Sequence, residues 1–249
     1  MTWAIIARDP RSGLYGIALA SRFFAAGAVC LNTEAGVGAA SIQSLPNPPL
    51  GPRALTLLRL GYDAATVRDM LVRSDPGIEM RQLHLMDRHG RTAAFTGSGC
   101  VGWAGHRAGD GWCVAGNMLA GPDVVDHTCE AYASNPDLPF VDRLVAAMDA
   151  GEAAGGDKRG KQAAALCIQG AEPYRRLDLR VDDHPEPLAE LRRLHEVAKS
   201  RFLPFSRSFP TSEHPYGTTD REVAEGFVEE GAGKDLELVI PLPNDRSLA

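Results

Sequence analysis

Thr2 is the residue of this sequence with the most direct route to chemistry, because it stands second in the chain, just ahead of the apolar run 3–7. If Met1 is removed, Thr2 becomes an N-terminal residue whose hydroxyl is a nucleophile and whose α-amine, with a reference pKa of about 8, is a base. The hydroxyl oxygen could then attack an amide carbonyl while the neutral amine takes the proton and later returns it. Threonine is also a common second residue in proteins without such chemistry, so the rest of the chain has to decide between the two interpretations.

Two further groups would support that reaction. A cation beside the amine would lower its pKa by repulsion between like charges and so keep it neutral, and Arg22 has the best position for this role. Donors for an oxyanion could come from the side-chain amide of Asn117 or from the backbone N–H groups of residues 38–41. Thr2, Arg22 and Asn117 are therefore predicted to be catalytic residues.

The cluster Asp182-Asp183-His184 is the strongest candidate for a metal site in this sequence. Neighbouring residues of an extended strand point to opposite faces, so the cluster is a poor chelate, and no HxxxH or HExxH spacing occurs. Asp183 or His184 is better explained as a cap for the helix that follows Pro185. We therefore expect neither a metal nor a cofactor.

Seven glycines lie between residues 97 and 117, a density that indicates tight turns or close approach of the backbone to a partner. The segment matches neither the dinucleotide-binding fingerprint nor the phosphate-binding loop, which argues against nucleotide binding. The cysteines have no metal or redox spacing and stand among apolar or small neighbours, so buried reduced thiols without a chemical role are predicted. They are Cys30, Cys100, Cys113, Cys129 and Cys167.

Short strands and the helices that cover them must position these residues. Alternating and short apolar runs predict strands at 3–7, 14–20, 28–32, 36–43, 82–87, 91–95, 163–168 and 179–181. Helical periodicity and capping residues predict helices at 53–60, after an N-cap at Asp63, after Pro122, after Pro139 and at 187–199. The helices before residue 151 form two consecutive pairs, and each pair is expected to cover one face of a sheet.

The sequence changes character after about residue 202. Three prolines and the run Gly217-Thr218-Thr219 predict an extended arm, followed by a short acidic helix at 220–230. Residues 236–240 would form either a terminal strand or a docking segment for another subunit. We therefore predict a domain at 1–203 and a C-terminal extension at 204–249 that packs on the domain or on a partner subunit, an arrangement that favours a homodimer.

Several long segments resemble one known family. They are residues 2–9, 16–23, 51–53, 103–106, 116–122, 155–162 and 178–185, and in this order they are similar to family 1028 of the domains of unknown function. The resemblance runs from residue 2 to about residue 200. That family is similar in turn to the N-terminal-nucleophile (Ntn) hydrolases. The resemblance therefore implies an α+β fold, a four-layer αββα sandwich of two antiparallel sheets between helical layers, and amide hydrolysis by an N-terminal Thr, Ser or Cys.

The resemblance also implies site residues beyond Thr2, Arg22 and Asn117. In related hydrolases a polar group on the second strand lies beside the nucleophile, which implies an orienting role for Ser21. The loop 155–162 is among the best-matched stretches, although by itself it would read as a solvated polar turn. The residues expected to bind substrate on this basis are Ser41, Gln43, His106, Asp157, Arg159 and Gln162.

Composition agrees with a globular fold. The 249 residues are 44% hydrophobic and 23% charged, enough to bury a full core, and the net charge of −6 argues against a nucleic-acid partner. The longest apolar runs are too short to cross a bilayer and no leader pattern precedes Thr2, so no membrane association and a cytoplasmic location are expected.

Two function classes stay open. The first is an amidohydrolase that acts on a small amide or peptide-like metabolite, as Thr2 and the polar loops suggest. The second is a non-catalytic ligand-binding or oligomer-forming protein on the same scaffold, because position 32 is Asn and the third strand has no lysine where many relatives place a cation.

Overall fold

The computed structural model describes residues 2–231 and divides the chain into two compact units. The first unit ends at Arg192 and the second begins at Arg193. Every strand of the described residues lies in the first unit, as do the residues predicted to form the site. In the second unit, the described residues with regular secondary structure are helical.

The first unit is built on two antiparallel sheets. Sheet A contains, in spatial order, β10 (Arg175–Val181), β9 (Ala163–Gln169), β2 (Tyr15–Ser21), β1 (Thr2–Arg8), β8 (Trp112–Leu119) and β7 (Trp103–Gly109). Sheet B contains β3 (Leu31–Glu34), β4 (Gly38–Ser44), β5 (Arg81–Asp87) and β6 (Thr92–Thr96). The first strand of the chain therefore lies inside the larger sheet, between β2 and β8.

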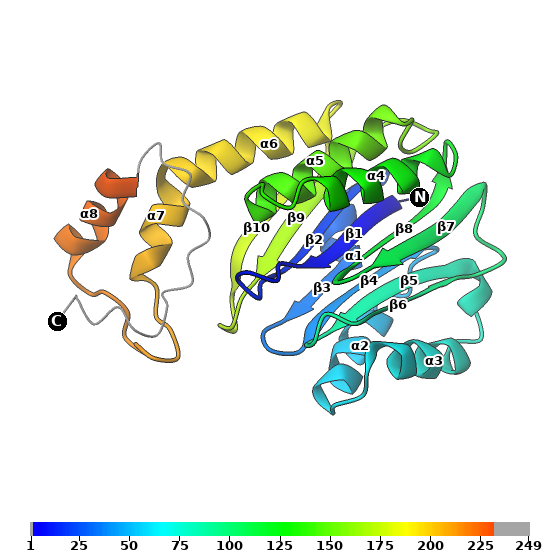
Figure 1. Cartoon of the computed structure of the whole chain (residues 1–249), viewed down its shortest axis with the longest axis horizontal. Helices are drawn as coiled ribbons and strands as arrows, with labels where there is room; N and C mark the ends of the chain where they lie inside the picture. Colours follow the sequence, from blue (N-terminus) through cyan, green and yellow to red (C-terminus); the bar gives the residue numbers. More distant parts are fainter. Residues whose placement is uncertain (1, 232–249) are drawn as a thin grey trace. The chain divides into compact units, whose positions relative to one another are not determined.

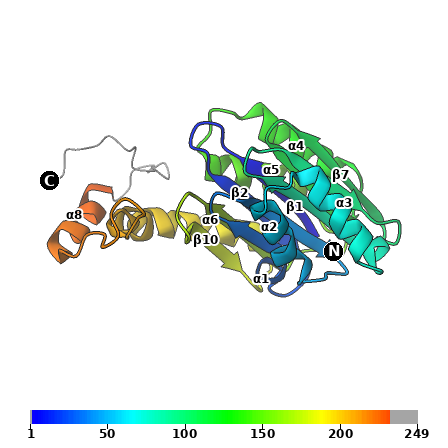
Figure 2. The same cartoon turned by 90° about the horizontal axis from the view of Figure 1, so that it is seen from below.

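Helices cover the outer face of each sheet. Helices α4 (Asp123–Ser134) and α5 (Phe140–Ala153) lie over sheet A, and α2 (Leu50–Arg59) and α3 (Ala64–Ser74) lie over sheet B (Figure 1). Figure 2 shows the α2 and α3 pair on its side of the sandwich. The predicted four-layer αββα sandwich is confirmed.

Alternation along the strands assigns each side chain to a layer. Leu83 and Leu85 of β5 face outward and pack with α2 and α3, whereas Met86 of the same strand faces the other sheet. Ile6 and Ile17 join Met86 between the sheets. The helix starts follow the predicted signals, since α4 and α5 begin directly after Pro122 and Pro139, and Asp63 Oδ1 accepts the Thr66 N–H at 2.8 Å.

The layer between the sheets changes from apolar to polar along β1. Ile6 and Ala4 belong to its apolar cluster, but the next inward-facing residue toward the chain start is Thr2. On sheet B the inward face changes in the same direction, from Ala39 to Ser41 and Gln43. One half of this layer is therefore an ordinary core, and the other half is buried and polar.

Two predicted features are wrong in part. Residues 28–32 were expected to be one strand, but α1 (Ala26–Cys30) occupies most of this segment and β3 begins only at Leu31. Helix α1 packs on β9, where an added Cβ on Gly27 would collide with the Ala165 side chain, so its glycine permits the close contact. The glycine-rich segment 97–117, in which no strand was expected, contains β7 and most of β8.

The second unit contains the end of α6 (Pro187–Val197), a π-helical turn at Ala198–Phe202, α7 (Leu203–Phe205), a 3-10 turn at Ser206–Ser208 and α8 (Arg221–Gly231). Helix α8 confirms the helix predicted at 220–230. The strand or docking segment predicted at 236–240 lies outside the described residues. Among residues 2–231, no helix has both the length and the apolar character needed to cross a bilayer.

Candidate functional site

Thr2 opens β1 and lies between one polar residue on each neighbouring strand. In the register of sheet A, Thr2 pairs with Ser21 on β2 and with Asn117 on β8. The Thr2 and Ser21 hydroxyl oxygens are 3.1 Å apart, which is a hydrogen bond, and the two residues are only 4% and 2% exposed. The structure therefore brings together the predicted nucleophile and its predicted orienting partner.

Amide side chains hold the Thr2 main chain from both sheets. Asn117 Nδ2 and Gln43 Nε2 donate to the Thr2 carbonyl oxygen at 3.3 and 3.4 Å. The same two nitrogens donate to Gln82 Oε1 at 2.9 and 2.8 Å. Thr2 is thus connected to Gln82 through two parallel bridges.

Gln82 continues this network away from Thr2. Its Nε2 lies 2.8 Å from the Gly116 carbonyl, 3.0 Å from the Gly105 carbonyl and 2.9 Å from Thr96 Oγ1. Three acceptors around one nitrogen fix the orientation of the amide. Because Gln82 belongs to sheet B and both glycines to sheet A, this side chain joins the two sheets.

His106 is the outermost member of the network. The distance from Thr96 Oγ1 to His106 Nδ1 is 2.9 Å. Since Thr96 Oγ1 accepts from Gln82, its own proton can be donated to His106 Nδ1, which fits a neutral ring. Partial burial, together with the charges of Arg107 and Arg68, lowers the pKa of His106.

Ser41 and His84 lie one step deeper between the sheets. They are directly opposite each other on β4 and β5, and both are fully buried. Burial, reinforced by repulsion from His106, lowers the pKa of His84 to about 3. His84 is therefore a neutral imidazole at physiological pH.

The loop that follows α5 is attached beside the same strand ends. The Asp157 carboxylate accepts the backbone N–H groups of Arg22 and Arg159, each at 2.9 Å, and forms an ion pair with the Arg159 guanidinium at 3.2 Å. The Arg22 guanidinium donates to the Arg159 carbonyl, and Asp157 also forms a β-bridge with Leu119. Asp157 thus ties the ends of β2 and β8 together.

Backbone strain is concentrated at this end of the sandwich. Three non-glycine residues among those described have positive φ: Ala25 at 53°, Ser44 at 75° and Met118 at 56°. Ser44 and Met118 lie at the ends of β4 and β8, and Ala25 follows the end of β2, all at the end where β1 begins. Strained backbone persists where the surrounding structure enforces it, and such positions cluster at functional sites.

The structure does not bring all predicted residues into contact. Thr2, Ser21, Gln43 and Asn117 form the centre. His106 joins them through Gln82, and Arg22, Asp157 and Arg159 form the adjoining loop. Gln162 lies outside this arrangement, because its amide donates to Asp183 at 3.1 Å. His184 Nδ1 accepts the Glu186 N–H at 3.0 Å, just before the first residue of α6. An N-cap side chain accepts from the second or third residue of a helix, so the cap by Asp183 or His184 stays a prediction.

Both groups of oxyanion donors suggested by the sequence are already occupied. The N–H groups of residues 38–41 belong to β4, which has a hydrogen-bonded strand on each side. The Asn117 amide donates to the Thr2 carbonyl and to Gln82. The backbone donors are therefore wrong, and Asn117 holds Thr2 in place with the hydrogen atoms that an oxyanion would need.

Two buried polar residues of this layer, Gln82 and His84, were not predicted. The signal was present in the alternation at 82–87, which places both on the same face as Met86. A polar residue at a core position of a buried strand needs a partner, and this requirement points to a network.

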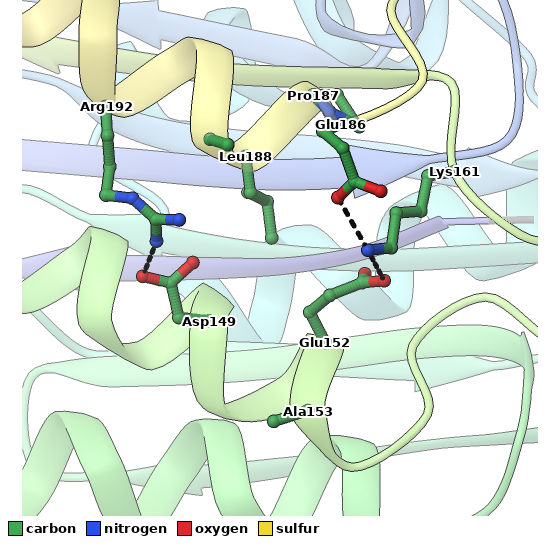
Figure 3. A pocket seen from close by; sticks show the side chains of 9 residues that line it. Asp149, Glu152, Ala153, Lys161, Glu186, Pro187, Leu188 and Arg192 are labelled. Atoms are coloured by element: carbon green, nitrogen blue, oxygen red, sulfur yellow. Dashed lines mark hydrogen bonds and ion pairs between the residues drawn. The ribbon is translucent and has the colours of Figure 1, made fainter.

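A separate cavity of about 520 Å³ lies between α5 and the start of α6 (Figure 3). Its charged residues are paired across it: Lys161 with Glu152 at 3.4 Å and with Glu186 at 2.8 Å, and Arg192 with Asp149. Burial raises the pKa of both Asp149 and Glu152. These ion pairs give every charged side chain of the cavity a partner, so the charges are explained by a structural role that holds α5 to the start of α6.

The cysteines and acidic residues offer no second chemical centre in the part of the chain that the structure describes. All five thiols are free, and burial raises the pKa of Cys30, Cys113 and Cys129 to about 12 and that of Cys167 to about 11. No group of three or more His, Cys, Asp or Glu side chains within residues 2–231 is arranged to hold a metal ion.

Comparison with known proteins identifies a family of unknown function and two structures similar to this chain. The family model described as "Family of unknown function (DUF1028)" matches residues 2–191. The crystal structure of a protein from Silicibacter pomeroyi, which is described with the same family, is similar to this chain with a TM-score of 0.83. The two sequences are 30% identical, and the match covers 88% of this chain and 96% of that chain. Anbu, an ancestral beta-subunit from Yersinia bercovieri, is 13% identical with a TM-score of 0.39, over 80% and 96% of the two chains. No curated protein matches the chain.

Proposed function

This chain belongs to the DUF1028 family, a family of unknown function, and on the geometry of its site we propose that it is an N-terminal threonine amidohydrolase. In this proposal Met1 is removed, Thr2 is the nucleophile, and the substrate is a small amide or a peptide-like metabolite. The chemistry requires no metal and no cofactor.

One observation carries the proposal. Thr2 begins a strand inside the larger sheet, and its hydroxyl is hydrogen-bonded to the Ser21 hydroxyl at 3.1 Å within a buried polar network. A cross-strand Thr–Ser pair also occurs as ordinary sheet stabilisation, so it is the position of Thr2 at the start of the chain together with this pair that favours a nucleophile. Here the hydroxyl faces another hydroxyl, two amide side chains donate to the carbonyl of the same residue, and Gln82 holds both of those amides.

The reaction follows from these positions. The neutral α-amine accepts the hydroxyl proton as Thr2 Oγ1 attacks the amide carbonyl carbon, and the amine then gives that proton to the departing nitrogen as the C–N bond breaks. The acyl group stays on Thr2 as an ester. A water molecule then attacks the ester, releases the carboxylic acid and returns the proton to the Thr2 oxygen.

The neighbouring residues have supporting roles in this scheme. Ser21 orients the Thr2 hydroxyl, and Gln43 and Asn117 hold the carbonyl of the same residue so that the nucleophile keeps its direction. Arg22 provides positive charge near the start of β1. Asp157 and Arg159 form the loop that we assign to substrate binding, and the strained residues Ser44 and Met118 support a functional interpretation of this end of the sandwich.

The test compares variants that differ only at the proposed nucleophile. Hydrolysis is measured with chromogenic anilides of single amino acids and of short peptides. Thr2→Ala is expected to lower kcat/KM by more than about 10³-fold, and Thr2→Ser is expected to retain part of the activity because it keeps a hydroxyl.

A second control keeps every side chain. One glutamate inserted between Met1 and Thr2 leaves the Thr2 hydroxyl in place but denies it a free amine, so it should be as inactive as Thr2→Ala. Equal rates in the native chain and in Thr2→Ala would overturn the proposal. That result would leave the non-catalytic ligand-binding or oligomer-forming protein as the better interpretation.

A further inference from the structure

The polar half of the layer between the sheets contains four buried atoms with unmet hydrogen bonds. Within residues 2–231, no partner lies in reach of Ser41 Oγ, Gln43 Oε1 or either ring nitrogen of His84. All three residues are 0% exposed. Buried polar atoms are almost always paired with protein or with ordered water, so four in one place require an explanation.

The residues that carry these four atoms are neighbours on the inner face of sheet B. Ser41 and His84 are cross-strand partners on β4 and β5, and Gln43 follows Ser41 on the same face of β4. Cross-strand partners hold their Cβ atoms about 5 Å apart, so the hydroxyl and the ring lie side by side. Gln43 Nε2 donates to the Ala115 carbonyl and to Gln82 Oε1. Because the amide group is planar, these bonds also fix the direction of its unpartnered oxygen.

The facing residues of sheet A are small. Ala4 and Ala115 are paired neighbours on β1 and β8, one inward-facing position deeper than Thr2 and Asn117. A methyl group at these two positions fills less of the layer than the Ile6 side chain does at the next inward-facing position of β1. The wall formed by sheet B is therefore polar, and the wall formed by sheet A has short side chains. This combination suits a small polar occupant.

The donor and acceptor pattern identifies that occupant. The Gln43 oxygen can only accept, the Ser41 hydroxyl can do both, and a neutral imidazole offers one N–H and one acceptor nitrogen. One histidine without a carboxylate or thiolate is a poor set for a metal ion. A neutral molecule that both donates and accepts fits all four atoms.

We propose that Ser41, Gln43 and His84 hold one or two ordered water molecules between the two sheets. Through Gln43 this water is connected to the Thr2 carbonyl, which makes Ser41 and His84 positioning residues for the start of β1. The proposal rests on burial and hydrogen bonding alone and does not depend on amide hydrolysis.

The decisive experiment is a high-resolution crystal structure of the full chain. The expected result is electron density for water within about 2.7–3.2 Å of Ser41 Oγ and of one His84 nitrogen. A dry contact, with the His84 ring bonded directly to protein atoms or to nothing, would overturn the proposal. This measurement uses the unaltered chain and is decisive even if every variant fails to fold.

Oxygen-17 magnetic relaxation dispersion gives a second readout, because it counts long-lived buried waters in solution. Ser41→Ala should reduce that count by at least one and lower the melting temperature by several degrees, since the water would lose a partner. Ser98→Ala, at an exposed hydroxyl on the loop after β6, is the matched control and should leave the count unchanged. An unchanged count together with an equal or higher melting temperature in Ser41→Ala would show a dry site and contradict the proposal.

Discussion

Thr2 is fixed by side chains from four different strands, and none of them is close to it in sequence. Ser21 holds its hydroxyl, Asn117 and Gln43 hold its carbonyl, and Gln82 holds both amides. Each donor in this set has an acceptor at 2.8–3.4 Å. A buried network of this kind fixes one arrangement, because any rotated amide would leave an N–H without a partner.

The buried imidazole of His84 makes folding sensitive to acid. The folded pKa is about 3, below the value of about 6.5 for an unfolded histidine, so only the unfolded chain takes up this proton as the pH falls through that window. The stability present above the unfolded pKa is lost as the unfolded histidine takes up its proton, and the loss approaches about 1.4 kcal/mol per pH unit only well below a pH of about 6.5. Summed over the titration between pH values of about 7.5 and 5.5, His84 should remove about 1.4 kcal/mol.

Urea unfolding at these two pH values checks this prediction. In His84→Leu the loss should be smaller than in the native chain by that amount, because the other histidines contribute equally to both. His106 is the titratable group whose charge acts on His84, so His106→Gln serves as a second comparison. If the free energy of unfolding changed equally with pH in the native chain and in His84→Leu, His84 would take up its proton in the folded protein as readily as in the unfolded chain. That result would contradict a lowered pKa of His84.

At the scale of elements, glycines at contact points allow the helical layer and the sheet to pack closely against each other. Gly16 on β2 lies directly under α5, where an added Cβ would be 2.5 Å from Leu144 Cδ1 and 2.9 Å from Phe140 Cε1. Since β2 carries Ser21 at its other end, the seating of α5 on this strand also helps to fix the partner of Thr2. A side chain at this position would force the layers apart.

Gly16→Ala is therefore expected to destabilise the fold by about 1–3 kcal/mol through overpacking. Gly121→Ala is the matched control, because no atom lies within 4 Å of its added Cβ, and it should change the stability by less than about 0.5 kcal/mol. The free energies of unfolding from urea titrations give both values. Equal effects of the two substitutions would contradict the close seating of α5 on β2.

Elements with a clear apolar period were predictable from the sequence. Both predicted hairpins, β1 with β2 from short apolar runs and β5 with β6 from alternation, formed as expected, as did the helices that begin after Asp63, Pro122 and Pro139. The hairpin of β7 and β8 was missed because glycines interrupt both of its strands. In the structure, Trp103 and Trp112 lie against Gly105 and Gly109, so large side chains two or three residues away cover the bare backbone.

The site was predictable only where a residue's own chemistry marked it. Thr2 stood out by type and position, and Ser21 and Asn117 pair with it in the sheet. The alternation at 82–87 marked Gln82 and His84 only as polar residues at core positions, and their neighbours across the sandwich come from strand pairing that no local pattern contains. The position of Gln162 depends on its bond to Asp183, which is equally non-local.

At the scale of the whole molecule, the site and its supporting core belong to one unit. The apolar clusters on sheet B and between the sheets contain only residues that precede Arg192, and the residues from Arg193 onward form a separate unit. A fragment of residues 1–203 contains the whole first unit and all of α6. It is therefore expected to fold cooperatively, with a urea midpoint close to that of the full chain.

A shorter fragment, residues 1–169, provides the control for this prediction. It lacks β10, so β9 becomes an exposed edge and the buried Leu177 and Val181 are lost. This fragment should fail to unfold cooperatively. If the 1–203 fragment behaved in the same way, the first unit would depend on the C-terminal residues for its stability.

The central claim is that Thr2 acts through its hydroxyl and its own amine. It is tested most directly by intact-mass measurement of the purified chain before and after treatment with a β-lactone, an electrophile that acylates a nucleophilic hydroxyl by ring opening. The proposal predicts that Met1 is absent, that the mass then rises by one lactone, and that peptide mapping places the adduct on Thr2, with none in Thr2→Ala or in the chain with the inserted glutamate. Retention of Met1 in every molecule, or a free Thr2 that gains no adduct, would contradict it.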